Sequence, residues 1–221
     1  MSDSDSFIDE VSEEVRRDRL FGLMKRWGWV AILAVLLLVG GAAFNEYRKA
    51  QNAARAQALG DGILEALEAN EEADARALAL GALEETLATK GDAHALLALI
   101  AAGEEAQADQ RSAAAARLRT LAEHSELRPV YRDLGLLKAA MLDPDLSDEA
   151  RIIALTPLSQ AGAPYWLLAQ EQIAISEAAL GKTDEAIERL TRAADNAEAS
   201  QALRSRAEQL IVALGGELDS E

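Results

Sequence analysis

The two histidines of the chain, His94 and His124, carry the side chains that most readily bind metals or transfer protons near neutral pH. Helical metal sites often place a second ligand four residues from the first, and neither histidine has one three or four residues further on. The chain has no cysteine, which excludes disulfides, thiolate nucleophiles and cysteine-ligated metals. We therefore predict no metal site and expect each histidine at the surface or half-buried on a helix.

Pairs of adjacent glutamates, such as Glu71-Glu72, Glu84-Glu85 and Glu104-Glu105, are the other candidates for acid–base chemistry. Charged side chains in alanine-rich helices normally face solvent, so we interpret these pairs as solvated surface rather than as general acid and base. The sequence contains no glycine-rich phosphate loop, no G-x-S-x-G elbow and no H-E-x-x-H motif. We predict that the protein is not an enzyme and uses no cofactor.

The composition indicates an all-α protein. Ala and Leu dominate the 221 residues, whereas aromatic residues make up 4% and prolines number four, which favours helix over sheet. Of the formal net charge of −16, residues 1–44 hold seven acidic and five basic side chains, which leaves −14 for residues 45–221. A domain with this much negative charge is repelled by the phosphates of nucleic acids and by anionic lipid headgroups. We therefore expect neither nucleic acid nor an anionic lipid surface as a partner.

One uncharged apolar stretch of eighteen residues, Trp27 to Phe44, divides the chain. As a helix it would measure about 27 Å, close to the hydrocarbon thickness of a bilayer. It is preceded by more basic side chains than follow it within a similar distance: Arg16, Arg17, Arg19, Lys25 and Arg26 against Arg48, Lys49 and Arg55. The apolar stretch therefore predicts one transmembrane helix. The bias in basic side chains predicts its orientation, with the N-terminus in the cytoplasm and residues 45–221 outside it.

Two alternatives to a transmembrane helix stay open at this point. The small residues Gly41, Ala42 and Ala43 suit a signal peptidase, and cleavage after Ala43 would release the rest of the chain. A signal peptide with a preceding segment of about 26 residues and seven acidic side chains would be unusual, however. A buried core helix is the second alternative, although eighteen uncharged residues exceed what such a helix needs.

Residues 1–26 form the predicted cytoplasmic tail. Phe7, Val11 and Val15 follow one another at four-residue spacing, which predicts a short amphipathic helix over 7–25. The preceding residues are polar and typical of a disordered end.

Beyond Phe44, helix-forming runs alternate with breaks at Gly, Asp, Asn and Pro. Gly60 and Gly62 could interrupt the first run. We predict helices over 46–69, 72–88, 92–107, 111–124, 128–142, 147–159, 163–180, 183–196 and 199–214. The segments repeat with a period of 36, because Asp148-Glu149-Ala150 recurs as Asp184-Glu185-Ala186 and Ala114 precedes Ala150 by 36 residues. Such a period is typical of stacked helix pairs.

The stretch ALGKTDEAIERLTRAA, from Ala179 to Ala194, resembles the tetratricopeptide repeat. Gly181 matches the turn of the repeat, and Ala174 and Ala186 match the small residues that let its two helices pack closely. The resemblance implies a tetratricopeptide-like α-solenoid of antiparallel helix pairs over residues 45–221. An unrelated alanine-rich bundle is the alternative.

The match to the repeat differs along the chain. It is good over 163–196, fair over 94–124 and poor over 128–160. In the poor unit Lys138 stands where a small residue is expected, and Pro157 falls late in the second helix.

A tetratricopeptide-like solenoid would line its concave face with the first helix of each pair. This implies a candidate partner-binding surface made of Leu96, Leu99, Leu168, Glu171 and Ile175, with Gly103 and Ala178 beside them. Each apolar member fits a core position equally well. For the aromatic pair Tyr165 and Trp166, packing between repeats is the favoured interpretation over anchoring a partner.

The order of parts resembles the YfgM-like family, the ancillary subunit of the bacterial SecYEG translocon. The resemblance rests on that layout, on ARAQALGDGILEAL (Ala54 to Leu67) and on ADQRSAAAARLRTL (Ala108 to Leu121). It implies a single-pass protein of the bacterial inner membrane with a periplasmic domain. The partners implied are the SecYEG translocon, the membrane-anchored chaperone PpiD and periplasmic chaperones.

Our leading interpretation is thus a non-enzymatic scaffold that holds partners where secreted chains emerge. A membrane-tethered tetratricopeptide adaptor for another envelope or cytochrome assembly process is the second. A substrate-binding or enzymatic domain with a pocket of buried polar groups is the third.

Overall fold

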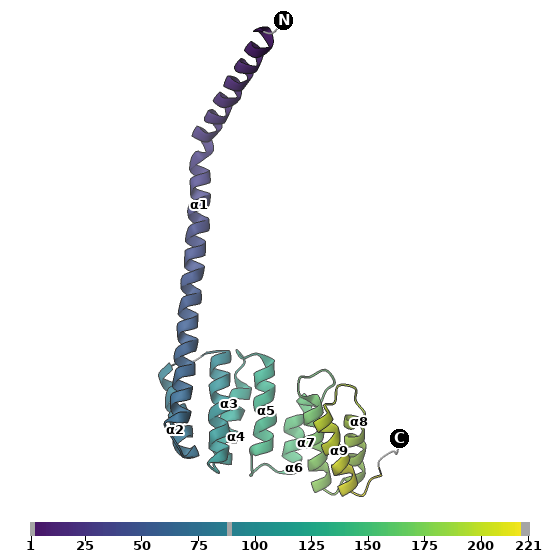
Figure 1. Cartoon of the computed structure of the whole chain (residues 1–221). Helices are drawn as coiled ribbons and strands as arrows, with labels where there is room; N and C mark the ends of the chain where they lie inside the picture. Colours follow the sequence, from purple (N-terminus) through teal and green to yellow (C-terminus); the bar gives the residue numbers. More distant parts are fainter. Residues whose placement is uncertain (1–2, 88–89, 218–221) are drawn as a thin grey trace. The chain divides into compact units, whose positions relative to one another are not determined.

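The computed structural model of the chain describes the backbone of residues 3–87 and 90–217 and the side chains of residues 28–30, 32–86 and 90–217. Every regular element in these ranges is a helix, which confirms the all-α prediction (Figure 1). The elements are α1 (Asp3–Glu68), α2 (Ala73–Leu87), α3 (Asp92–Gln107), α4 (Arg111–Glu123), α5 (Pro129–Leu142), α6 (Asp148–Leu155), the short 3₁₀ helix η1 (Thr156–Leu158), α7 (Trp166–Ala179), α8 (Thr183–Ala194) and α9 (Gln201–Ala213).

Helix α1 contains all three segments that the sequence predicts as separate helices, 7–25, 27–44 and 46–69. The expected interruption at Gly60 and Gly62 is wrong, because a glycine inside a helix costs only about 1 kcal/mol and is tolerated. A Cβ at Gly62 would lie 2.8 Å from the Leu83 side chain, so this glycine lets α1 and α2 approach closely. The predicted amphipathic face of 7–25 lies outside the described side chains.

The chain divides into two units, residues 1–58 and 59–221. In the first unit, α1 is apolar and long enough to span a membrane: its best eighteen-residue window has a mean hydropathy of 2.0, and none of that window is buried. The described side chains from Ile32 to Phe44 are all exposed. Within the first unit this segment therefore forms no buried core helix.

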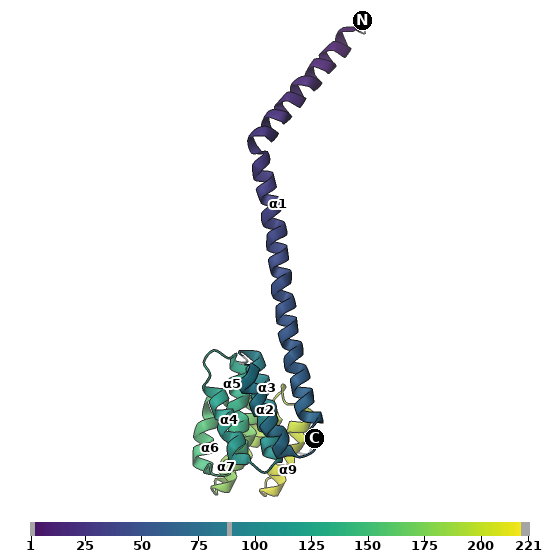
Figure 2. The same ribbon diagram turned by 90° about the vertical axis from the view of Figure 1, so that its left-hand side faces the viewer.

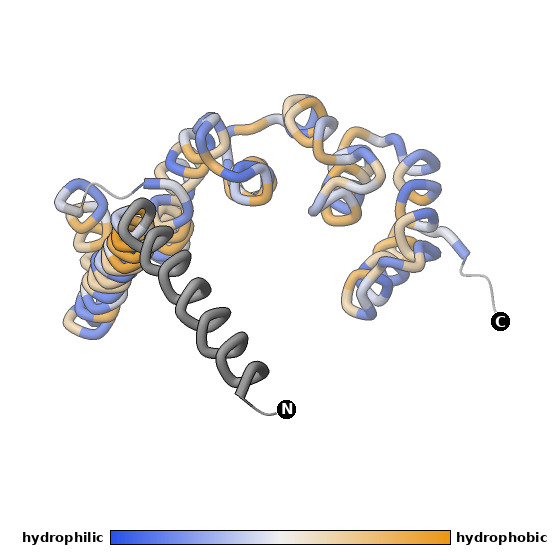
Figure 3. The backbone as a smooth tube through the Cα atoms, turned by 90° about the horizontal axis from the view of Figure 1, so that it is seen from above, coloured by the Kyte–Doolittle hydropathy of each residue, from blue (hydrophilic) through white to orange (hydrophobic). Residues whose placement is uncertain are grey.

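In the second unit each helix packs on the next one in the sequence, so the core is a series of small clusters (Figures 1 and 2). Seen from above, the helix pairs follow one another in chain order (Figure 3). The clusters contain, in chain order, Leu80 with Leu97, Leu118 with Leu121, Leu155 with Ile173, and Leu190 with Ile211. Alanines fill much of the remaining core because close approach of two helices requires small side chains.

Three turns of the second unit share one pattern of backbone hydrogen bonds, the Schellman motif that closes many helices. The residue in the left-handed conformation is Asp109 after α3 (φ 61°), Gly181 after α7 (φ 75°) and Gly215 after α9 (φ 88°). At each turn the next residue donates its N–H to a carbonyl five residues back: Gln110 to Glu105 (2.8 Å), Lys182 to Glu177 (2.9 Å) and Gly216 to Ile211 (2.9 Å).

The α3–α4 and α7–α8 pairs are equivalent at an offset of 72 residues, twice the predicted period. The predicted close-packing residues Ala174 and Ala186 are both fully buried in one cluster. Their equivalents Ala102 and Ala114 are buried together in another cluster. The two pairs thus bury alanines at matching positions.

The middle pair, α5 and α6, departs from this pattern. Helix α6 ends at Leu155, short of the predicted 159, and Pro157 lies in η1 because proline cannot donate the backbone hydrogen bond that would continue the helix. Lys138 is exposed, while Leu137, Ala139 and Ala140 around it are buried. The position of Lys138, where the repeat would place a small residue, therefore faces solvent in this pair.

Candidate functional site

A groove of about 570 Å³ opens between α5, α7 and α9, and we call it the α7–α9 groove. It brings together three of the five predicted partner-binding residues, Leu168, Glu171 and Ile175. Their spacing of three and four residues places them on one face of α7. The rest of the lining is Met141, Gln172, Arg206, Gln209, Leu210 and Ala213.

The apolar side chains of this groove are open to solvent. Leu168 is 37% exposed, Ile175 41% and Met141 52%, whereas the core leucines of the same unit are at most 9% exposed. Their neighbour Ala178, also on α7, is half-buried and packs against the core. The groove thus offers a patch of apolar surface that the chain itself leaves partly uncovered.

An ion pair between buried Glu171 on α7 and half-exposed Arg206 on α9 joins two of the helices that form the groove. Both oxygens of Glu171 accept hydrogen bonds from Arg206, from Nε at 2.7 Å and from Nη2 at 2.8 Å. Glu171 is only 3% exposed, and its hydrogen bonds raise the pKa of the Arg206 guanidinium. This two-point contact links α9 to α7 beside the groove.

Sequence reasoning found the α7 side of the groove and missed the α9 side and Met141. Arg206 follows Glu171 by 35 residues, close to the 36-residue period, which is the one signal that could have paired them. Met141 carries no such signal because it comes from α5 of the irregular middle pair.

The other two predicted partner-binding residues, Leu96 and Leu99, lie on α3 and do not line this groove. Leu96 is 48% exposed, and it is equivalent to Leu168 at the 72-residue offset. Leu99 is half-buried against the cluster around Leu118, so it contributes to the core. Gly103 is exposed one turn further along α3.

The aromatic pair Tyr165 and Trp166 packs between helices, as the favoured interpretation predicts. Tyr165 packs against the cluster of Leu155 and Ile173. Trp166 packs against Leu203 and its neighbours, and its Nε1 donates a hydrogen bond to Glu198 at 3.2 Å.

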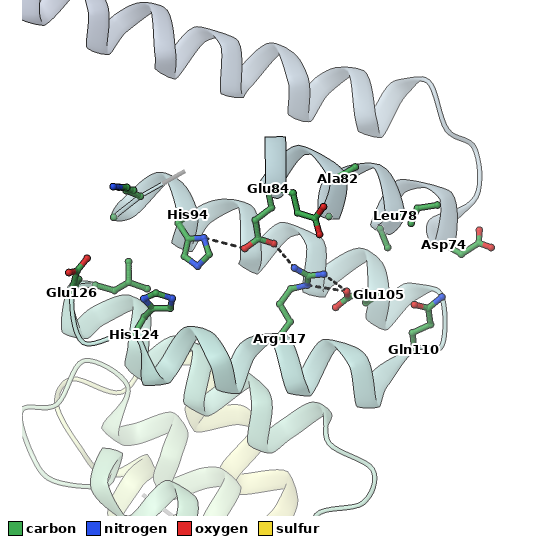
Figure 4. A pocket seen from close by; sticks show the side chains of 16 residues that line it. Asp74, Leu78, Ala82, Glu84, His94, Glu105, Gln110, Arg117, His124 and Glu126 are labelled. Atoms are coloured by element: carbon green, nitrogen blue, oxygen red, sulfur yellow. Dashed lines mark hydrogen bonds and ion pairs between the residues drawn. The ribbon is translucent and has the colours of Figure 1, made fainter. Parts of the chain in front are cut away.

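A second, more polar cavity of about 1080 Å³ lies between α2, α3 and α4, and we call it the acidic cleft (Figure 4). His94 and His124 meet in its wall with ring centroids 5.2 Å apart, although thirty residues separate them in sequence. His94 Nδ1 lies 3.2 Å from Glu84 Oε1. Among the described residues there is no group of three or more His, Asp or Glu side chains that could hold a metal ion.

The interpretation of the glutamate pairs as solvated surface holds for Glu71 and Glu72, which are exposed. It is wrong for Glu105, which is 7% exposed and accepts two hydrogen bonds from Arg117, at 3.0 and 2.8 Å. It is also wrong for Glu84 and Glu104, which are half-buried in ion pairs with Arg117 and Arg76. Partners in neighbouring helices, which sequence spacing does not reveal, bind these carboxylates.

Comparisons with protein-family models, curated proteins and solved structures give no match to this chain.

Proposed function

We propose that the chain is a non-enzymatic scaffold anchored in the inner membrane of a bacterium, ancillary to the SecYEG translocon. The resemblance to the YfgM-like family and the exposed apolar part of α1 support the anchor. The bias of basic residues toward the N-terminal flank supports a periplasmic position for residues 45–221. In this role the domain holds a PpiD-like chaperone and periplasmic chaperones where secreted chains emerge.

The observation that carries the binding role is the α7–α9 groove. Fully burying a Leu, Ile or Met side chain contributes about 1.5–3 kcal/mol relative to full exposure, so the half-exposed Leu168, Ile175 and Met141 leave several kcal/mol for a partner to gain. An apolar side chain of the partner would fill the groove, and the Glu171–Arg206 pair keeps it open.

The tetratricopeptide-like solenoid is part of the same proposal. Two helix pairs equivalent at 72 residues, with fully buried alanines at matching positions and the same turn after the first helix, support it. Helix pairs stacked in this way leave long surfaces open to partners, which suits a scaffold.

Protease digestion of intact spheroplasts tests the membrane arrangement. We expect residues 45–221 to be degraded, because the protease reaches only the periplasmic side, and a tagged N-terminus to survive as a short membrane-bound fragment. Protection of the whole chain would place the domain in the cytoplasm and contradict the proposal. A mature chain that begins at Phe44 would show cleavage in place of an anchor.

Affinity purification of the full chain from nanodisc extracts tests the partners. We expect translocon subunits and a PpiD-like chaperone with the wild type, and their loss with Leu168→Asp/Ile175→Asp, which places charge in the groove. The matched control is Ile153→Asp/Val212→Asp, because Ile153 and Val212 are exposed apolar residues outside the groove. Translocon subunits absent from every preparation would contradict the proposal. Recovery of envelope or cytochrome assembly proteins instead would support the adaptor alternative.

A further inference from the structure

The acidic cleft differs in chemistry from the α7–α9 groove and lies on other helices. Side chains from α2, α3, α4 and the connections after α2 and α4 converge on it (Figure 4). Its charged lining consists of five acidic and two basic side chains: Asp74, Glu84, Glu85, Glu105 and Glu126 against Lys90 and Arg117. With neutral histidines the cleft therefore carries a net charge of −3.

The charge that faces solvent is also mainly acidic, with Asp74, Glu85 and Glu126 exposed against one exposed cation, Lys90. Arg117 is engaged within the cleft, because it binds Glu84 at 2.5 Å and Glu105 at 2.8 Å. These contacts, with that to Glu105 the strongest, raise the pKa of Arg117, so it stays charged and holds both carboxylates in place. Glu85 and Glu126 are exposed at the cleft, and no ion pair involves them in the described part of the chain. They are available to a cation that enters.

Glu105 gives a second indication of a missing partner. Its side chain is nine-tenths buried and lines the cleft, and both Arg117 donors bind its Oε1. The other oxygen, Oε2, is buried and has no hydrogen-bond partner among the described residues. Leaving a buried acceptor unpaired is unfavourable, and more so when it is charged, so a donor that binds in the cleft would be stabilised by this oxygen.

The cleft also has an apolar edge. Leu78 is 77% exposed there, the highest exposure of any large apolar side chain described, and Ala77 and Ala82 lie beside it. A small inorganic cation would gain nothing from Leu78. A peptide segment with both basic and apolar side chains would use the whole lining.

We propose that the acidic cleft binds a basic amphipathic segment of a partner protein. Lysine or arginine side chains of the segment meet Glu85, Glu126 and Glu105, and an apolar side chain covers Leu78. This second binding surface does not depend on the occupant of the α7–α9 groove, since the two sites share no residue.

Fluorescence anisotropy with the full chain in zwitterionic nanodiscs tests this site. The probe is a labelled Lys/Leu peptide with lysines on one helical face, and empty nanodiscs provide the blank. We expect Glu85→Gln/Glu126→Gln to weaken binding about tenfold, because the variant loses two exposed charge contacts with the peptide. The matched control is Glu149→Gln/Glu185→Gln, which removes two exposed acids outside the cleft and should change affinity less than twofold.

Two further measurements sharpen the test. Raising salt from about 50 to about 500 mM should weaken binding to the wild type, because screening shortens the reach of exposed charges. Leu78→Ser should also weaken peptide binding, because the peptide loses an apolar contact. Binding through charges alone would be unchanged by this substitution. Equal affinity of the cleft variant and the matched control would overturn the proposal, as would equal binding of a Glu/Leu peptide.

Discussion

Asp109 is the one described residue other than glycine with a positive φ, and its equivalent 72 residues later is Gly181. The left-handed conformation costs an L-residue about 1–2 kcal/mol, less for Asp, and nothing for glycine. Asp109→Gly should therefore raise the free energy of unfolding by about 0.5–1 kcal/mol, measured by urea titration with circular dichroism. Gly181→Ala should lower it by about 1 kcal/mol. A destabilising Asp109→Gly would contradict the equivalence of the two turns.

Asp143, which follows α5, makes the free energy of unfolding depend on pH. Its burial alone would raise its pKa, but hydrogen bonds from the Asp145 backbone N–H (3.0 Å) and from Arg119 outweigh burial and hold the pKa below its ordinary value. The folded state therefore binds this proton less readily than the unfolded chain. The resulting stabilisation is complete well above about pH 4, the ordinary pKa of an aspartate, and is lost as pH falls through the lower folded pKa.

Asp143→Asn removes this titration. We expect the variant to be less stable than the wild type by about 1 kcal/mol at pH 7 and the difference to shrink at pH 3. Urea unfolding at both pH values measures it. A difference that stays constant between them would show that ionisation of Asp143 contributes nothing.

At the scale of elements, Gly135 explains why α5 packs so closely on α4. A Cβ there would lie 3.0 Å from the Leu118 carbonyl oxygen and 3.3 Å from the Leu121 side chain. Gly135→Ala gains about 1 kcal/mol of helix propensity but pushes α5 off the α4 backbone, and overpacking costs about 1–3 kcal/mol. We expect net destabilisation.

The control for this prediction is Gly103→Ala on α3, where a Cβ meets nothing within 4 Å. It should stabilise the domain by about 1 kcal/mol in the same urea titration. If Gly135→Ala and Gly103→Ala both stabilise the domain, α5 does not pack on α4 as closely as the contact of Gly135 with Leu118 indicates.

Helix positions were predictable where a local signal marks them. The predicted 92–107 coincides with α3, because Gly91-Asp92 begins the helix and the Asp109 turn ends it. The three N-terminal segments were not predictable as one helix, since their composition changes from charged to apolar and back while the backbone stays helical. In the candidate site, Leu168, Glu171 and Ile175 could be grouped by helical spacing. Arg206 and the meeting of His94 with His124 could not, because long-range packing brings them together.

At the scale of the whole molecule, the proposed scaffold separates membrane anchoring from partner binding. The apolar part of α1 has the length and composition to cross a membrane, and the acidic domain has little attraction to anionic lipid. Binding then depends on surfaces within residues 59–217. The α7–α9 groove suits an apolar side chain and the acidic cleft a basic one, and the two share no residue, so in the proposed scaffold each site takes its own partner segment.

Site-specific photo-cross-linking in intact cells tests the central claim most directly. A photoreactive amino acid replaces Leu168 in the groove, or Glu188 on the exposed surface of α8 as the control. The scaffold account predicts adducts with a translocon subunit or a PpiD-like chaperone from position 168 and none from position 188. Adducts with those proteins from neither position, or equally from both, would contradict it.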